Sequence, residues 1–82
     1  MNADPILDRI EINPKILIGK PVIRGTRLSV EYILGLLAKG VTLEELIQEY
    51  PGLSPEDVQA CLLFATRTLQ NTLFMPLQNK VE

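Results

Sequence analysis

The sequence contains no histidine and no tryptophan, and its single cysteine is Cys61. Without an imidazole, the chain lacks the group that most often transfers protons or binds transition metals near neutral pH. One thiol cannot form a disulfide within the chain. Neither a Ser/His/Asp or Cys/His set nor a glycine-rich phosphate motif is present. We therefore expect a protein that is not an enzyme and that uses no metal ion or cofactor.

Long apolar runs are also missing. No stretch approaches the roughly 18 to 20 apolar residues that cross a bilayer. No basic segment followed by an apolar region and a cleavage site marks a secretory leader. These absences predict a soluble, cytoplasmic protein that does not associate with membranes.

The length of 82 residues predicts one domain with a small core. A chain this short buries only about two thirds of its unfolded surface. Its core then contributes a net stabilisation of roughly 3–5 kcal/mol. Association with a second copy would add to that stability, so we expect a homodimer.

Charge is distributed unevenly along the chain, although the net charge is only −2. Residues 1–27 hold five cations and three anions, a net charge of +2, whereas residues 28–82 hold three cations and seven anions, a net charge of −4. An anionic partner would therefore meet the N-terminal part more favourably. The isoelectric point of about 5.1 argues against a broad nucleic-acid-binding surface.

Local constraints in the N-terminal third predict a small β arm. The alternation in Ile10-Glu11-Ile12 predicts a half-buried strand over residues 9–12. The β-branched pair Val22-Ile23 predicts a second strand over residues 20–24. The two strands can pair within one chain or between two chains, and a lone hairpin must pack on helices to be stable. Residues 1–7 carry little pattern, and we expect them to fray.

A basic turn follows the second strand. Gly25 permits the positive φ of a sharp turn, and it lies between Arg24 and Arg27 beside the hydroxyl of Thr26. With Lys20, these residues are the candidate contact to nucleic acid, because a glycine lets backbone amides approach a phosphate. In the alternative, Arg24 and Arg27 form ion pairs with carboxylates of the same chain or of a second subunit, such as Glu31 or Glu11, and only fix the turn, which is the commoner role of isolated arginines.

Three helices are predicted over residues 29–39, 43–50 and 55–74, each from an N-cap followed by apolar residues at helical spacing. The expected N-caps are Ser29, Thr42 and Ser54. Gly40 suits the left-handed position after the first helix, and Pro51-Gly52 ends the second. Thr42 and Glu45 fit a capping box, and Pro55 occupies the first position of the third helix.

One apolar stripe on the third helix is expected to close the core. It consists of Val58, Cys61, Leu62, Ala65 and Leu69. Cys61 lies on this stripe, which favours packing over a nucleophilic role. A second set of apolar residues falls at least partly outside it: Leu63, Phe64, Leu73 and Phe74. The second set indicates either a wider buried face or a contact with a second copy or a partner, and the sequence favours neither.

Together these elements predict a mostly α fold, a three-helix, helix-turn-helix-like (homeodomain-like) body over residues 29–75. The β arm and turn occupy residues 9–28, and residues 76–82 form a tail. The four-residue connection over residues 51–54 gives the second and third helices helix-turn-helix spacing. Gln59 on the third helix could bond to adenine. Glu56 and Asp57, however, would approach the DNA backbone without a local cation, which argues against groove reading by this helix.

The stretch at the centre of the chain resembles the signature of the bacterial family known as domain of unknown function 433. It reads Ile18-Gly19-Lys20-Pro21-Val22-Ile23-Arg24-Gly25-Thr26-Arg27-Leu28-Ser29-Val30. The resemblance extends to Ile12-Asn13-Pro14, Gly40-Val41-Thr42, Tyr50-Pro51-Gly52-Leu53 and Ser54-Pro55-Glu56-Asp57-Val58, and covers roughly residues 10–65. It implies a small helix-turn-helix-like domain comparable with antitoxins and often paired with a PIN-like ribonuclease.

Two hypotheses of function follow. In the first, the chain is an antitoxin-like regulator that binds DNA and pairs with a PIN-like ribonuclease toxin. In the second, it is an interaction or dimerisation module that binds no nucleic acid. The apolar residues expected to hold the partner are Leu63, Phe74, Met75 and Leu77. The dimer could use the arm strands or the surplus apolar residues of the third helix.

Overall fold

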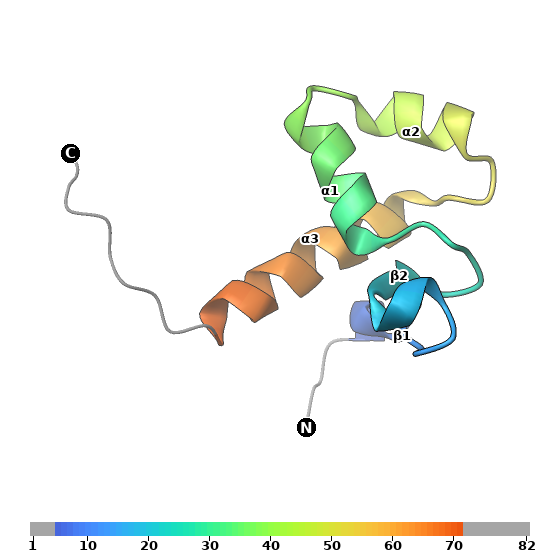
Figure 1. Cartoon of the computed structure of the whole chain (residues 1–82). Helices are drawn as coiled ribbons and strands as arrows, with labels where there is room; N and C mark the ends of the chain where they lie inside the picture. The colour runs from blue at the N-terminus through green and yellow to red at the C-terminus, as the bar shows by residue number, and fades with distance from the viewer. Residues whose placement is uncertain (1–4, 72–82) are drawn as a thin grey trace, which may run out of the picture.

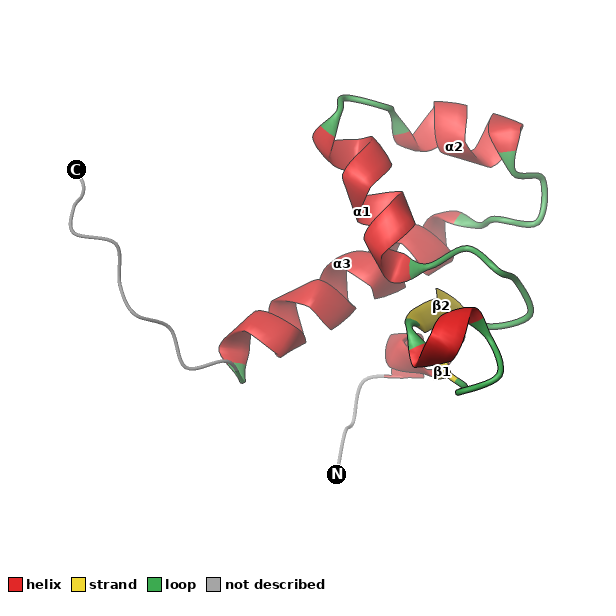
Figure 2. Cartoon of the chain, viewed as in Figure 1, coloured by secondary structure: helices red, strands yellow, loops and turns green. Residues whose placement is uncertain are grey.

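The computed structural model describes residues 5–71, which form three α-helices behind a short β-hairpin (Figures 1 and 2). This is the mostly helical fold that the sequence predicts. The hairpin strands are β1 (Ile10–Ile12) and β2 (Pro21–Ile23), and the helices are α1 (Val30–Ala38), α2 (Leu43–Glu49) and α3 (Pro55–Gln70). The described residues also form two short 3-10 helices, η1 (Pro5–Arg9) and η2 (Leu17–Gly19). No helix in this part of the chain is long and apolar enough to cross a membrane.

The hairpin forms within one chain, which decides between the two pairings that the sequence left open. β1 and β2 are antiparallel, with Ile10 opposite Ile23 and Ile12 opposite Pro21. The predicted burial of both isoleucines of β1 is wrong for Ile12, which is 60% exposed. Ile10 packs against the core, whereas Ile12 sits at the other end of a three-residue ladder.

The predicted caps are confirmed at all three helices. The Ser29 hydroxyl accepts a hydrogen bond from the Tyr32 N–H at 2.9 Å. Thr42 and Ser54 form capping boxes with Glu45 and Asp57. Because each cap uses groups within three residues of one another, the helix starts are readable from the sequence.

The ends of the helices lie close to the predictions except in α3. That helix was predicted to continue to residue 74, but it ends at Gln70 with Asn71 as its C-cap. Leu69 and Gln70 are exposed, so no core contact extends the helix there, and propensity alone rarely does. Residues 72–74 lie outside the described part of the chain.

The N-terminal segment differs from its prediction. Residues 5–7 were expected to fray, but they belong to η1, which packs against α3. Ile6 and Leu7 are half-buried there. A single 3-10 turn is too short to show an apolar period, and the helix that it contacts is some fifty residues away in the sequence.

The core is built from all three helices and β2. Its buried members are Ile23, Val30, Ile33, Leu46, Leu53, Val58 and Cys61. On α3, the predicted stripe is right for Val58 and Cys61 but wrong for Leu62 and Leu69, which are 48% and 54% exposed. Ala60 is fully buried instead, because η1 and β1 pack on α3 and turn its buried face toward them.

The loop between the strands has an unusual backbone. Leu17 and Ile18 have positive φ values of 50° and 57°, and Gly19 follows with 81°. A left-handed conformation costs an L-residue roughly 1–2 kcal/mol, and it is rarest for a β-branched side chain. Ile18 is 95% exposed, so burial of its side chain within the described chain does not offset that cost.

Candidate nucleic-acid interface

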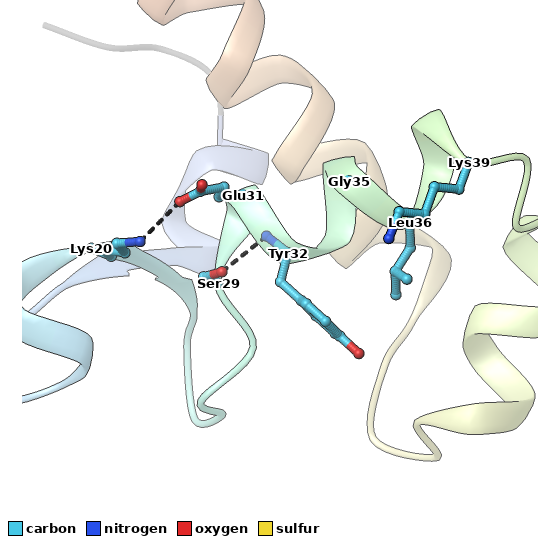
Figure 3. A pocket seen from close by; sticks show the side chains of 7 residues that line it. All are labelled: Lys20, Ser29, Glu31, Tyr32, Gly35, Leu36 and Lys39. Atoms are coloured by element: carbon cyan, nitrogen blue, oxygen red, sulfur yellow. Dashed lines mark hydrogen bonds and ion pairs between the residues drawn. The ribbon is translucent and has the colours of Figure 1, made fainter.

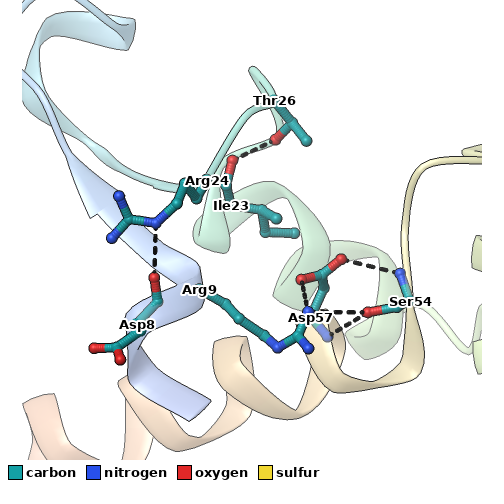
Figure 4. Close-up of polar contacts among 7 residues, drawn as sticks. All are labelled: Asp8, Arg9, Ile23, Arg24, Thr26, Ser54 and Asp57. Carbon is teal, nitrogen blue, oxygen red and sulfur yellow. Dashed lines mark hydrogen bonds and ion pairs between the residues drawn. The ribbon is translucent and has the colours of Figure 1, made fainter. Parts of the chain in front are cut away.

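The basic turn has the conformation that the sequence predicts. Gly25 has a φ of 80°. The Thr26 hydroxyl donates to the Ile23 carbonyl at 2.7 Å (Figure 4). It also accepts from the Leu28 N–H at 3.0 Å. Thr26 was a candidate contact to nucleic acid, but its only hydroxyl proton is used inside the turn. Its role in this structure is to hold the turn closed.

Arg24 is held by backbone groups and not by the expected carboxylates. Its Nε donates to the Asp8 carbonyl at 2.8 Å (Figure 4). Its main-chain N–H donates to the Arg9 carbonyl at 2.7 Å. Within residues 5–71, the intrachain ion pair with Glu31 or Glu11 is therefore wrong for Arg24, and a pair with a second subunit stays a prediction. A carbonyl carries no formal charge, so the exposed guanidinium is oriented without being neutralised. Its two terminal nitrogens make no hydrogen bond to other described residues and can donate to a ligand.

Arg27 lies at the far side of the same turn and is exposed. Among residues 5–71 it makes no hydrogen bond or ion pair. The turn therefore presents two guanidinium groups on either side of Gly25, and no carboxylate of this part of the chain pairs with either of them. This arrangement suits a phosphate, which a guanidinium binds through paired N–H donors.

Lys20 is separated from the turn and is paired. Its Nζ lies 3.0 Å from Glu31 Oε1, at the start of α1 (Figure 3). Lys20 precedes β2 and Arg24 follows it, so the two lie about 13 Å apart along the strand. The structure therefore does not gather Lys20 with Arg24 and Arg27. It lines an open depression of about 330 Å³ whose other basic residue is Lys39.

Arg9 is a residue of this region that sequence reasoning missed. Its Nη1 lies 3.1 Å from Asp57 Oδ1 and 3.4 Å from Ser54 Oγ, at the first turn of α3 (Figure 4). The Asp57 side chain is only 10% exposed, and it also accepts the Ser54 N–H at 3.0 Å. The prediction that α3 begins without a local cation is therefore wrong. The pair spans 48 positions, and no short-range pattern reveals it.

Arg9 also connects the basic turn to α3. Its carbonyl accepts the Arg24 N–H, while its side chain binds Asp57. Gln59 lies exposed on α3, two residues after Asp57. The turn and the beginning of α3 thus both contact Arg9, the last residue of η1, although they are some thirty residues apart in the sequence.

The apolar residues predicted to hold a partner are only partly described. Leu63 is half-buried on α3, whereas Phe74, Met75 and Leu77 lie outside residues 5–71. The surplus apolar surface of α3 comes instead from Leu62 and Leu69. An apolar groove of about 360 Å³ runs beside Leu69, between α1 and α3. Its lining residues are Pro21, Val30, Glu31, Leu34, Phe64, Ala65, Thr68 and Leu69.

Two titratable groups in the body have raised pKa values. Burial, together with the smaller effect of the nearby Asp57 charge, raises the pKa of the Cys61 thiol to about 11. The thiol is therefore protonated at neutral pH and packs as an apolar group, as predicted. The pKa of Tyr50 is raised mainly by its hydrogen bond with Tyr32, whose hydroxyl oxygen lies 2.7 Å away. This pair ties α1 to the end of α2.

Comparisons with known proteins identify one family. Residues 10–65 match the family described as "Protein of unknown function (DUF433)". The uncharacterized protein y4eO of Sinorhizobium fredii (strain NBRC 101917 / NGR234) is 34% identical over 53 residues, which is 65% of this chain and 24% of that protein. The chain thus spans about a quarter of this curated relative.

A solved structure agrees with the fold. The crystal structure of a DUF433 member protein from Anabaena variabilis ATCC 29413 superposes with a TM-score of 0.72 at 31% sequence identity. The match covers 76% of this chain and 61% of that one.

Proposed function

This chain belongs to the bacterial DUF433 family, whose function is unknown, and we propose that it is a small DNA-binding regulator that acts as a homodimer. The observation that carries the proposal is the pair of exposed guanidinium groups on the Arg24–Arg27 turn. Within residues 5–71, neither is neutralised by a carboxylate.

The turn acts on the DNA backbone. The Arg24 side chain is held by the hydrogen bond from its Nε to the Asp8 carbonyl, which leaves its charge intact, so less side-chain freedom is lost when it meets a phosphate. Phosphate contacts of this kind supply affinity and register and carry no sequence information. A homodimer presents four such groups.

The start of α3 supplies the second contact. Arg9 neutralises Asp57, which removes one of the two charges that would repel DNA at this helix. Gln59 then reads a base edge, most favourably an adenine. Glu56 remains exposed and opposes binding, so the contact made by α3 modulates sequence preference and adds little affinity.

The antitoxin part of the proposal rests on the family resemblance. A PIN-like ribonuclease toxin is the proposed partner, and its proposed anchors are Leu63, Phe74, Met75 and Leu77. Co-expression with the product of a neighbouring ribonuclease gene is expected to give a complex that survives purification. The chain shortened to residues 1–71 is expected to lose that complex and to keep its helical content by circular dichroism.

DNA binding is tested by fluorescence anisotropy on two duplexes of equal length, one from upstream of the gene itself and one unrelated. With four neutralised phosphates, log K is expected to fall with log salt at a slope of roughly −3 to −4. Arg24→Ala and Arg27→Ala weaken binding to both duplexes about equally, whereas Gln59→Ala changes only the preference between them. Lys39→Ala, which removes the same charge at the end of α1, is the matched control and leaves affinity nearly unchanged.

A second function is supported by the apolar groove and the net charge of −2. In this case the chain is an interaction module that binds no nucleic acid. Absence of binding to either duplex at low salt and tens of micromolar protein would favour the module. Loss of binding in Glu56 or Gln59 variants, with the arginine variants unaffected, would assign the main contact to α3 instead of the turn.

A further inference from the structure

The loop between β1 and β2 presents two apolar side chains to solvent on a strained backbone. Leu17 and Ile18 both have positive φ values, and their side chains are 37% and 95% exposed. Hydrogen bonds from Gly19 N–H to the Ile16 carbonyl and from Lys20 N–H to the Leu17 carbonyl hold this conformation. Backbone strain that internal packing does not offset is characteristic of functional contacts. The loop therefore has the features of a contact whose partner is another molecule.

The same chain carries a cavity that suits these side chains. The apolar groove between α1 and α3 measures about 360 Å³. In proteins, a cavity of about 150 Å³ lined by aliphatic residues holds a benzene ring, so the groove has room for two aliphatic side chains. Pro21, which lies three residues after Ile18, is part of its lining. The loop and the groove thus occupy adjoining surfaces.

We propose that Leu17 and Ile18 of one copy insert into the apolar groove of a second copy, and that the exchange is reciprocal. The insertion cannot occur within one chain in this conformation, because Ile18 is 95% exposed. A two-fold axis near Pro21 places each loop against the other copy's groove and closes the assembly as a dimer. The exchange also covers Leu69, which lines the groove and is 54% exposed.

Charge agrees with this pairing. The loop over residues 13–20 holds Lys15 and Lys20 and no carboxylate. Among the groove residues, the only charged one is Glu31, an anion. Lys20 of each copy already pairs with Glu31 of its own chain, so Lys15 is the basic residue that the loop adds. The Glu31 side chain is exposed, so its carboxylate can accept Lys15 of the other copy as a second donor, which gives a weakly favourable contact.

The alternative dimer, made by pairing strands of two arms, is less compatible with the hairpin. The outer edge of β2 is already occupied by its own chain, because Ile23 N–H donates to the Leu28 carbonyl and Val22 bridges Ser29. Only β1, with three residues, is left to pair with a second sheet. A different protein could bind the loop or the groove, but it would leave the other feature uncovered. A second copy of this chain covers both, because each copy carries one loop and one groove.

The inference rests on the dimer in the proposed function, and the decisive variant is Ile18→Asn. Asparagine tolerates the left-handed region better than isoleucine, so the substitution removes the inserted side chain without straining the fold. Sedimentation equilibrium at micromolar concentration is expected to give twice the chain mass of 9.2 kDa for the wild type. The variant is expected to dissociate at least about tenfold more readily, as for a residue at the centre of an interface.

Groove variants complete the test. Leu69→Glu places a second acidic group in the groove and is expected to weaken the dimer as Ile18→Asn does. Leu62→Asn changes an equally exposed leucine of α3 that does not line the groove, and it leaves the mass unchanged. Because the exchange is reciprocal, a mixture of Ile18→Asn and Leu69→Glu chains restores one loop-groove contact and associates more tightly than either variant alone.

Each other outcome overturns the inference. A monomeric wild type removes the dimer altogether. An Ile18→Asn dimer of unchanged affinity, or a dimer broken by Leu62→Asn alone, assigns the interface to another surface. DNA binding by the wild type is measured separately, so a dimer that binds no DNA contradicts the proposed function and leaves the loop-groove contact intact.

Discussion

Ile18 combines a left-handed backbone with a β-branched side chain that is almost fully exposed. Either property alone occurs in ordinary loops. Together they leave the conformational free energy of the left-handed backbone without compensation from packing of the side chain within the described chain. Gly19, the next residue, also has a positive φ, and there glycine removes the penalty. An asparagine or a glycine would serve the loop equally well at position 18, which points to a use for the isoleucine side chain itself.

Ile18→Asn is expected to raise the free energy of unfolding of the monomer by about 1 kcal/mol, because asparagine pays less than isoleucine for a left-handed φ. Urea unfolding followed by circular dichroism, with the protein diluted below its association range, measures this change. Ile12→Asn is the control: Ile12 is also exposed but lies in β1, where asparagine is disfavoured, so stability should not rise. A fall in stability for Ile18→Asn would show that isoleucine is not strained at this position.

The Arg9–Asp57 ion pair stabilises the start of α3, and Arg9 also contacts the basic turn. Asp57 closes the capping box of α3, and Arg9 supplies the cation that makes burial of this carboxylate tolerable. The carbonyl of Arg9 meanwhile receives the N–H of Arg24. One arginine therefore sets both the start of α3 and the orientation of the basic turn.

At the scale of elements, α2 and α3 depend on their caps to different degrees. α2 has seven residues, too few for a stable helix without help, and its capping box satisfies orphan donors at its start. α3 is longer, but the Ser54 hydroxyl accepts both the Asp57 N–H and an Arg9 donor. Ser54 therefore links the helix to η1 as well as capping it.

Thr42→Ala is expected to lower the free energy of unfolding by about 1 kcal/mol, the usual loss for an N-cap, and Ser54→Ala by somewhat more because Arg9 also loses a contact. Thr66→Ala is the control, since its hydroxyl only donates to the Leu62 carbonyl one turn earlier in the same helix. Denaturant unfolding compares the three variants. Equal losses in Thr66→Ala and Thr42→Ala would show that the cap is unimportant.

The buried face of α3 is decided by what packs on it. Val58 and Cys61 belong to the stripe that periodicity predicts, but Leu62 and Leu69 of that stripe are exposed, and Ala60 is buried in their place. η1 and β1 contact the helix on the side that periodicity does not identify. Exposed leucines on α3 are thus a consequence of where the N-terminal segment docks.

At the scale of the whole molecule, the described chain leaves an apolar groove and an apolar loop on its surface. A small core limits the stability of a monomer of this size. Covering both features in a dimer would bury apolar surface that residues 5–71 of one chain leave exposed, and it would bring two basic turns into one assembly.

The thermal midpoint of the wild type is therefore expected to rise with protein concentration, by about 3–5 °C for each tenfold increase, because association stabilises the folded state by mass action. Ile18→Asn is expected to show this rise only at concentrations at least about tenfold higher. Differential scanning fluorimetry or circular dichroism at several concentrations measures both. A concentration-independent midpoint in the wild type would contradict a dimer coupled to folding.

Of the candidate interface, the sequence predicts the turn and the exposure of its arginines but not their partners. Gly25 between Arg24 and Arg27 is a local signal, and the positive φ follows from it. The partner of Arg24 is a backbone carbonyl of η1, and Lys20 binds Glu31 eleven residues away. Carbonyl groups carry no sequence identity, so no pattern of residue types could have indicated the first of these contacts.

The sequence by itself determined the positions of the three helices, the two strands and the glycine turn, because caps, β-branched residues and glycine act within three or four positions along the chain. Tertiary structure alone decided that η1 packs on α3, that Arg9 meets Asp57, and that Leu62, Leu69 and Ile18 stay exposed. These outcomes depend on contacts between segments that lie some fifty residues apart in the sequence. Helical periodicity states that a face is apolar, and only the packed neighbours decide whether that face is covered.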